Sequence, residues 1–264
     1  MRLRGSLFWG IVLILLAAFL LARQMGFLTG DVISFFLPAL AILFGIWLLI
    51  GALGRGQRQV EGQTVSVPLE NARSARIKFD HGAGRLNVRS GASATELLTG
   101  VFGTEMDVHS RLQGDQLEVR LRNAPHFWMW YPGQNLDWDI SLNRDVPVSL
   151  NIDSGASSTV LDLTDLKVTD LDIDTGASTT EVNLPANAGN TRVDIDTGAS
   201  TVKIRVPAGV AASIRIKSGL SSNNVDTNRF PRIDGGLFRS ADYSTAANRA
   251  DITVDSGVGS IEIR

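Results

Sequence analysis

The hexapeptide Ile173-Asp-Thr-Gly-Ala-Ser178 recurs along the chain and decides its fold. It returns as Ile195-Asp-Thr-Gly-Ala-Ser200 and, with one change, as Ile152-Asp-Ser-Gly-Ala-Ser157. A period of about twenty residues is typical of proteins that stack one small structural unit. The looser copies are Phe79-Asp-His-Gly-Ala-Gly84, Ile216-Lys-Ser-Gly-Leu-Ser221 and Val254-Asp-Ser-Gly-Val-Gly259.

The positions around each repeat glycine predict strands. Apolar residues stand five and three places before it, as in Leu171 and Ile173, with polar residues between them. Alternation with period two is typical of a strand that has one buried face. After the glycine, apolar pairs follow at plus four and plus six (Val202 and Ile204) or at plus six and plus eight. Both spacings are even, so one face stays buried throughout.

Each copy therefore predicts a strand, a glycine turn and a second strand. The turn glycines supply backbone freedom, and the adjacent Ser and Thr can bond turn amides. Stacked copies predict an all-β repeat domain over residues 71–264, either a β-solenoid or a twisted sandwich of strand pairs. The structural glycines are Gly82, Gly155, Gly176, Gly198, Gly219 and Gly257.

Two insertions interrupt the repeat, at residues 89–148 and 226–251. The first contains a hairpin signal at Gly114-Asp115 and the aromatic stretch His126-Phe-Trp-Met-Trp-Tyr131. The aromatics either cap the open end of the core or bind a partner or membrane, since Trp and Tyr favour interfaces. The candidate partner-binding residues are Phe127, Trp128, Trp130 and Tyr131.

The N-terminal residues 1–54 have a different composition, dominated by Leu, Ile, Phe, Ala and Gly. Residues 7–22 contain no charge and would form a helix of about 24 Å, and residues 32–53 one of about 33 Å. We expect a transmembrane helical hairpin over 1–54, followed by a linker at 55–70. In an alternative interpretation, residues 1–22 are a cleaved signal peptide.

Charged residues predict the orientation of this hairpin. Arg2 and Arg4 precede the first span and Arg55 follows the second, whereas the connector has only Arg23 opposed by Asp31. Because basic residues favour the cytoplasmic side, the β domain is expected in the cytoplasm.

Nothing in the sequence indicates an enzyme or a cofactor. The chain has no cysteine, and its net charge of −2 gives no reason to expect a nucleic-acid partner. The histidines His81, His109 and His126 lack metal-ligand spacing and are expected on the surface or in loops. Catalytic residues, cofactor and metal are therefore all predicted to be absent.

One set of equivalent acidic residues is the best candidate site. These aspartates would stack about 5 Å apart in neighbouring turns, and oxygen-rich ladders can bind calcium. Against this, Lys217 occupies the same position and breaks the series, which favours solvent-facing or turn-capping aspartates. The set comprises Asp80, Asp153, Asp174, Asp196 and Asp255.

Longer motifs carry a resemblance to a known family. Arg4-Gly-Ser-Leu-Phe-Trp-Gly10 and Gly45-Ile-Trp-Leu-Leu-Ile-Gly51 resemble the LiaI/LiaF-type transmembrane region. The remainder resembles the toast-rack β-repeat domains, including the LiaF C-terminal domain. The matching stretches are His81-Gly-Ala-Gly-Arg-Leu86, the Asp-Thr-Gly-Ala-Ser repeats, and residues 230–243 leading into Val254-Asp-Ser-Gly-Val-Gly-Ser260.

The resemblance implies a multi-pass protein of the bacterial inner membrane that acts as an accessory or regulator in cell-envelope stress sensing. Its implied partners are the lipid bilayer and a membrane sensor kinase or another envelope protein. The alternative function is a structural or adhesive module that binds an envelope polymer. An adhesin must lie outside the cell, so the topology discriminates between the two.

Overall fold

The computed structural model describes residues 62–124 and 136–264, and every regular element in them is a β-strand. The predicted hairpin over 1–54 lies outside the described residues. Within them, no helix is long and apolar enough to cross a membrane. The strands are β1 (Gln63–Pro68), β2 (Ser74–Ser90), β3 (Glu96–Phe102), β4 (Met106–Gln113), β5 (Gln116–Asn123), β6 (Trp138–Leu142), β7 (Pro147–Asp162), β8 (Lys167–Asn183), β9 (Asn190–Arg205), β10 (Ala211–Val225), β11 (Arg232–Asp234), β12 (Leu237–Arg239) and β13 (Arg249–Ile263).

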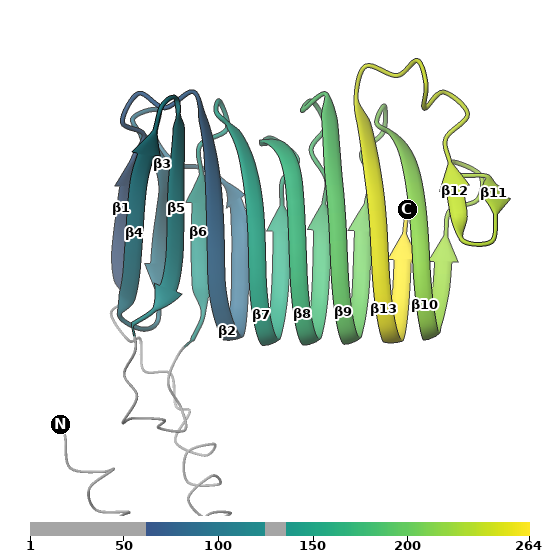
Figure 1. Ribbon diagram of the computed structural model, residues 1–264, viewed down its shortest axis with the longest axis horizontal. Coiled ribbons are helices and arrows are strands. Elements are labelled where there is room, and N and C mark those ends of the chain that lie inside the picture. The colour runs from purple at the N-terminus through teal and green to yellow at the C-terminus, as the bar shows by residue number, and fades with distance from the viewer. Residues whose placement is uncertain (1–61, 125–135) are drawn as a thin grey trace, which may run out of the picture. The chain divides into compact units, whose positions relative to one another are not determined.

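Six long strands, one for each copy of the repeat, build two layers. Each runs down one layer, bends at its repeat glycine and returns in the other layer (Figure 1). The predicted unit of strand, turn and strand is thus a single bent strand, such as β8 with 17 residues. We call the row of bends the bend edge; it lies at the bottom of Figure 1.

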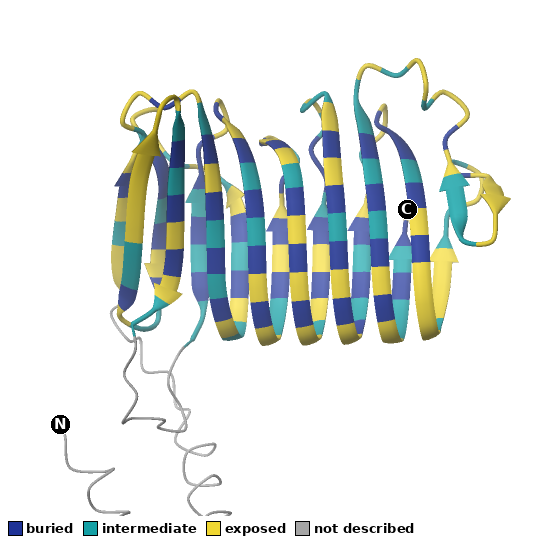
Figure 2. Ribbon diagram, viewed as in Figure 1, coloured by how far each residue is buried: buried dark blue, intermediate teal, exposed yellow. Residues whose placement is uncertain are grey.

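Neighbouring bent strands pair in parallel with the repeats in register. Ile173 of β8 lies between Ile152 of β7 and Ile195 of β9, and all three side chains are buried. The same alternation of buried and exposed residues runs along both halves of β2, β7, β8, β9 and β13, whereas in β10 it is confined to the half before the bend (Figure 2). The core therefore lies between the two layers, where the apolar rows face one another, as the period-two pattern predicts.

Two copies have their apolar pair at plus six and plus eight, as predicted, and these four leucine and valine side chains are buried. Leu161 pairs with Val182, which in turn pairs with Ile204, so plus six is the common buried position. The plus-four position holds Thr159 and Thr180, which are fully buried. Each threonine hydroxyl lies 3.3 Å from the hydroxyl of the serine two residues earlier. Hydrogen bonding therefore allows a polar side chain in an otherwise apolar row.

The order of strands in space departs from their order in the chain. The sheet runs β1-β3-β6-β2-β7-β8-β9-β13-β10-β12-β11, so the last strand lies between β9 and β10. β13 pairs in parallel with both neighbours. A solenoid that adds each copy at its growing end would have placed β13 outside β10, and the sequence pattern made no prediction of this order.

The remaining strands extend the two ends of the sheet. The Gly114-Asp115 signal forms the hairpin β4–β5, and Gly114 has a φ of 59°. β1 (Gln63–Pro68) falls within the predicted linker. Its residues form a strand because they pair with β3 and so join the sheet. At the other end, the second insertion forms the small hairpin β11–β12 beside β10.

The repeat glycines stand at the bends because the strands approach closely there. A Cβ on Gly176 would lie 2.9 Å from the carbonyl oxygen of Gly155, and one on Gly198 would lie 2.7 Å from that of Gly176. The same contact links Gly155 to Gly82, Gly257 to Gly198 and Gly219 to Gly257. Among the six, only Gly82 has a positive φ. Contact with the next strand, rather than backbone freedom, therefore explains the other five.

We expect Gly176→Ala to destabilise the domain by about 1–3 kcal/mol, the usual effect of inserting a methyl group where there is no space. Gly235→Ala is the matched control, because a Cβ there meets nothing within 4 Å. Urea unfolding measured by circular dichroism gives both values. Equal stability of the two variants would contradict the close-contact explanation.

Candidate functional site

The predicted partner-binding residues Phe127, Trp128, Trp130 and Tyr131 lie outside the described residues, but both ends of their segment are described. The chain leaves β5 at Ala124 and returns at Leu136. The amide of Ala124 donates to the carbonyl of Glu105 over 3.0 Å. We call Ala124, Leu136, Asp137 and the residues that bond them the stem of the aromatic insertion.

An arginine on β2 holds the returning end of the stem. The Arg85 amide donates to Asp137 Oδ1 over 3.0 Å, and its guanidinium donates to Oδ2 over 2.8 Å and 3.2 Å. The hydrogen bonds that Arg85 donates to Asp137 raise the pKa of Arg85 above its ordinary value. Gly84 allows the approach, since a Cβ there would lie 2.7 Å from the Leu136 oxygen. The stem is thus fixed against the bend of β2.

Asn123 joins both ends of the stem. Its side-chain oxygen accepts hydrogen bonds from the Thr104 hydroxyl at 3.0 Å and from Trp138 Nε1 at 3.3 Å. Its amide nitrogen donates to the His81 carbonyl over 3.3 Å. Trp138 is fully buried and packs edge-to-face on Phe102, with ring centroids 5.5 Å apart. A polar network and an aromatic cluster therefore meet at the stem.

His81 is fully buried, so the expectation of a surface or loop histidine was wrong for this residue. It occupies the inward position just before the repeat glycine, where β8 and β9 carry Thr175 and Thr197. Its Nε2 lies 3.1 Å from the Leu136 carbonyl and donates to it, and its Nδ1 has no partner among the described residues. Burial lowers the pKa of His81, opposed by the Leu136 bond and by Asp137. The imidazole is therefore held neutral.

The stem and the start of the β domain share the bend edge. Gln63, the first residue of β1, pairs with Phe102, which pairs with Trp138. Trp138 in turn pairs with Leu86, four residues beyond the repeat glycine Gly82 at the bend of β2. The chain therefore enters the sheet, and the insertion leaves and returns, on one side of the described domain (Figure 1).

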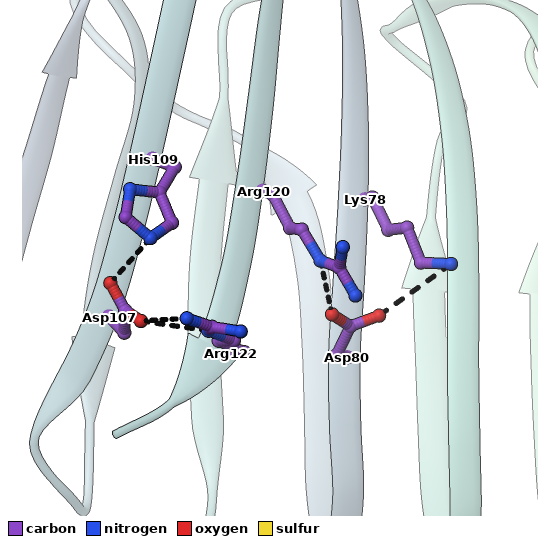
Figure 3. A network of polar contacts seen from close by, with 6 residues as sticks. All are labelled: Lys78, Asp80, Asp107, His109, Arg120 and Arg122. Carbon is purple, nitrogen blue, oxygen red and sulfur yellow. Dashed lines mark hydrogen bonds and ion pairs between the residues drawn. The ribbon is translucent and has the colours of Figure 1, made fainter. Parts of the chain in front are cut away.

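A polar cluster on β2, β4 and β5 binds the outer strands together (Figure 3). Asp107 accepts from Arg122 over 2.6–2.7 Å and lies 3.0 Å from His109 Nε2. Arg122 chiefly lowers the pKa of this carboxyl. Asp80 pairs with Arg120 and, at 3.7 Å, with Lys78. Since each carboxylate already has a cationic partner, this cluster serves to join strands.

The aspartate ladder is continuous in space, contrary to the expectation that Lys217 interrupts it. Asp153, Asp174, Asp196 and Asp255 are in-register neighbours on four adjacent strands. Lys217 pairs with Asp255 at the far end, because β13 lies inside β10. Asp80 continues the row on β2. In the described part of the chain, no three acidic or histidine side chains converge in a geometry that would hold a metal ion.

Comparisons with known proteins agree with this architecture. Residues 56–205 match the family described as the N-terminal domain of toast_rack, DUF2154. This chain belongs to the toast-rack family. Its repeat glycines lie at the bends, and its long strands form the two layers.

One solved structure shows the same fold. The "putative cell adhesion protein" of Clostridium sporogenes is 17% identical, with a TM-score of 0.70 over 76% of this chain and 97% of that one. The "putative adhesin" of Bacteroides fragilis is 9% identical over 76% and 96% of the two chains, with a TM-score of 0.31. No curated protein matches the sequence.

Arg85, Asn123 and Asp137, which hold the ends of the insertion in place, were not predicted from the sequence. None of them belongs to the repeat pattern, and they lie up to 52 residues apart in the chain. One signal was present: His81 stands where the other toast-rack copies have Ser, Thr or an equivalent small side chain. A large polar residue at a position that otherwise holds a small one indicates that its side chain contacts a segment outside the repeat.

The buried His81 predicts a pH dependence of stability. Its pKa is lowered from 6.5 in the folded state, so the unfolded chain binds more protons as the pH falls. Stability should be constant above about pH 7.5 and fall between about pH 6.5 and 5. Thermal melting across this range should show a smaller slope for His81→Thr than for wild type. Equal slopes would mean that another group titrates.

The aspartate ladder predicts a stabilising substitution. Like charges on adjacent strands repel, so Asp174→Asn should raise the Tm of the toast-rack domain by roughly one to three degrees. Raising NaCl from about 10 to 300 mM should stabilise wild type more than the variant, because salt screens exposed charges. If the Tm of the variant at low salt is no higher than that of wild type, the aspartates of the ladder do not repel one another measurably.

Proposed function

We propose that this toast-rack protein is a non-catalytic, membrane-anchored module of the bacterial envelope that presents its aromatic insertion to another envelope protein. The observation that carries the proposal is the stem, where Arg85, Asn123 and His81 fix both ends of the insertion. A loop whose ends are fixed loses less conformational entropy when it binds, which favours affinity. Trp and Tyr are the side chains most enriched at the centre of protein interfaces.

The position of the stem supports contact near a bilayer. The chain enters the β domain on the bend edge, and the two apolar runs at 7–22 and 32–53 precede this point in sequence. Under the arginine-flank orientation, the domain lies on the cytoplasmic side. In this arrangement the protein acts as an accessory of envelope-stress sensing, and the implied partner is a membrane sensor kinase.

A second candidate function follows from the structural relative. The Clostridium sporogenes protein carries the name of a cell adhesion protein and shares the fold. An adhesive module would use the same rigid domain outside the cell, with an envelope polymer as its ligand.

The test places a photo-crosslinking residue at Tyr131 of the full-length protein in intact cells. We expect crosslinking to one membrane protein, and Arg85→Ala should reduce its yield severalfold because the stem loosens. Arg89→Ala is the matched control: it lies on the same strand, and its exposed pair with Asp139 at 3.5 Å is outside the stem. Equal yields from both variants, or no protein crosslink, would contradict the proposal.

Labelling then separates the two candidate functions. The chain has no cysteine, so Thr179→Cys gives one exposed thiol on β8. A membrane-impermeant maleimide should label it only after cell lysis if the domain is cytoplasmic. Labelling of intact cells would instead favour the adhesive function.

A further inference from the structure

The stem buries a histidine between the two ends of the aromatic insertion. At the leaving end, the His81 carbonyl accepts from the amide nitrogen of Asn123 over 3.3 Å. At the returning end, its imidazole ring bonds to the Leu136 carbonyl and packs edge-to-face on Trp138, with ring centroids 4.9 Å apart. The His81 side chain is fully buried in this position. Water can therefore reach the ring only if one of these contacts opens.

Only one of the two ring nitrogens of His81 is satisfied. A carbonyl oxygen can only accept, so the single proton of the neutral ring lies on Nε2, which bonds to Leu136 over 3.1 Å. A second proton would have to go to Nδ1, which is buried and has no hydrogen-bond partner among the described residues. The charged ring would then be buried with an unpaired N–H, which is strongly unfavourable in a protein interior.

The charged side chains around His81 do not offset this cost. The charge of Asp137 raises the pKa of His81, but burial lowers the same pKa by more. The Asp137 carboxylate also already accepts hydrogen bonds from Arg85. None of the other charged side chains nearest in register is buried: Lys78 and Asp80 on β2, Glu105 before β4, Arg120 and Arg122 on β5, Asp139 on β6 and Asp153 on β7.

On its solvent side, the returning segment is held by contacts that water can replace. Asp137 pairs with Arg85, whose side chain is 69% exposed, and its carbonyl accepts from the Gly103 amide over 3.0 Å. Exposed ion pairs add little stability, because water solvates both partners when they separate. The next residue, Trp138, is fully buried and begins β6. Leu136 and Asp137 can therefore separate from β2 without unfolding of the sheet.

We propose that His81 is a pH-sensitive latch of the stem: when its Nδ1 takes up a proton, Leu136 and Asp137 separate from the bend of β2 and the ring becomes hydrated. The open form binds this proton more readily than the closed form. The closed stem is therefore favoured above about pH 6.5, and opening becomes easier as the pH falls below it. The consequence for binding rests on the proposed function: mild acid would loosen one end of the insertion and weaken its contact with the partner.

The test is amide hydrogen exchange, resolved by residue, on the full-length protein in detergent micelles between pH 7.5 and 5.5. The reporters are the amides of Arg85 and Gly103, which both donate to Asp137. Their protection factors, corrected for intrinsic exchange, should fall roughly tenfold over this range, because one proton binds the open form with a pKa of about 6.5.

Urea distinguishes opening of the latch from unfolding of the domain. Local opening exposes little surface, so exchange at Arg85 and Gly103 should depend only weakly on urea. The Leu184 amide, which donates to the Arg205 carbonyl over 3.0 Å between β8 and β9, is the reference for the core. Its exchange should depend strongly on urea, because it requires the sheet to unfold.

Histidine variants identify the group that titrates. His81→Gln keeps a side-chain N–H donor but cannot take up a proton, so protection at Arg85 and Gly103 should no longer depend on pH. His81→Thr restores the residue of β8 and β9 and should give the same pH-independent result should the glutamine variant fail to fold. His109→Gln and His126→Gln are the matched controls, since these are the other two histidines of the chain, and both should keep the wild-type pH dependence.

The proposal is overturned if the protection at Arg85 and Gly103 does not change with pH, or if its urea dependence equals that of Leu184. A pH dependence that survives in the His81 variants, or that disappears in a control variant, overturns it as well. None of these measurements involves a partner protein. A stem without pH dependence therefore leaves the crosslinking test at neutral pH intact, and absence of a crosslink leaves the latch intact.

Discussion

The contact between each repeat glycine and the carbonyl of the next one is the constraint on which the rest of the structure depends. The contacts link Gly82, Gly155, Gly176, Gly198, Gly257 and Gly219 in that spatial order. A side chain at any of the last five would force neighbouring bends apart. Because the bends set the distance between strands, the core rows and the outer rows are held in register by the same contacts.

Strict register places like charges side by side on the outside of the domain. Equivalent residues become neighbours, so five aspartates form one row with Lys217 at its end. On the inside, the same register stacks Ile152, Ile173 and Ile195, whose burial stabilises the domain. The apolar contacts act over short distances, whereas water screens the exposed charges. Burial of the apolar rows therefore stabilises the stacked repeat by more than the repulsion between the exposed aspartates destabilises it.

Specific features appear where the repeat is broken. At one end, His81 replaces a small hydroxyl residue, and the chain segments between β5 and β6 are held by the stem of the aromatic insertion. At the other end, β12 extends only one layer, and among the described strands residues 220–225 pair with β13 alone. Binding surfaces on a repeat domain are expected at such places, because interior copies have already satisfied their hydrogen bonds and apolar faces with their neighbours.

The sequence by itself determined the strands, their buried faces and the bends, because alternation and glycine spacing are local properties of the chain. It indicated the β4–β5 hairpin through Gly114-Asp115 for the same reason. Only the tertiary structure decided that β13 lies between β9 and β10, that His81 is buried, and that Arg85 meets Asp137. All copies of the repeat present nearly the same edge, so local pattern cannot choose between neighbours. That choice depends on the connections and on which edges other strands cover.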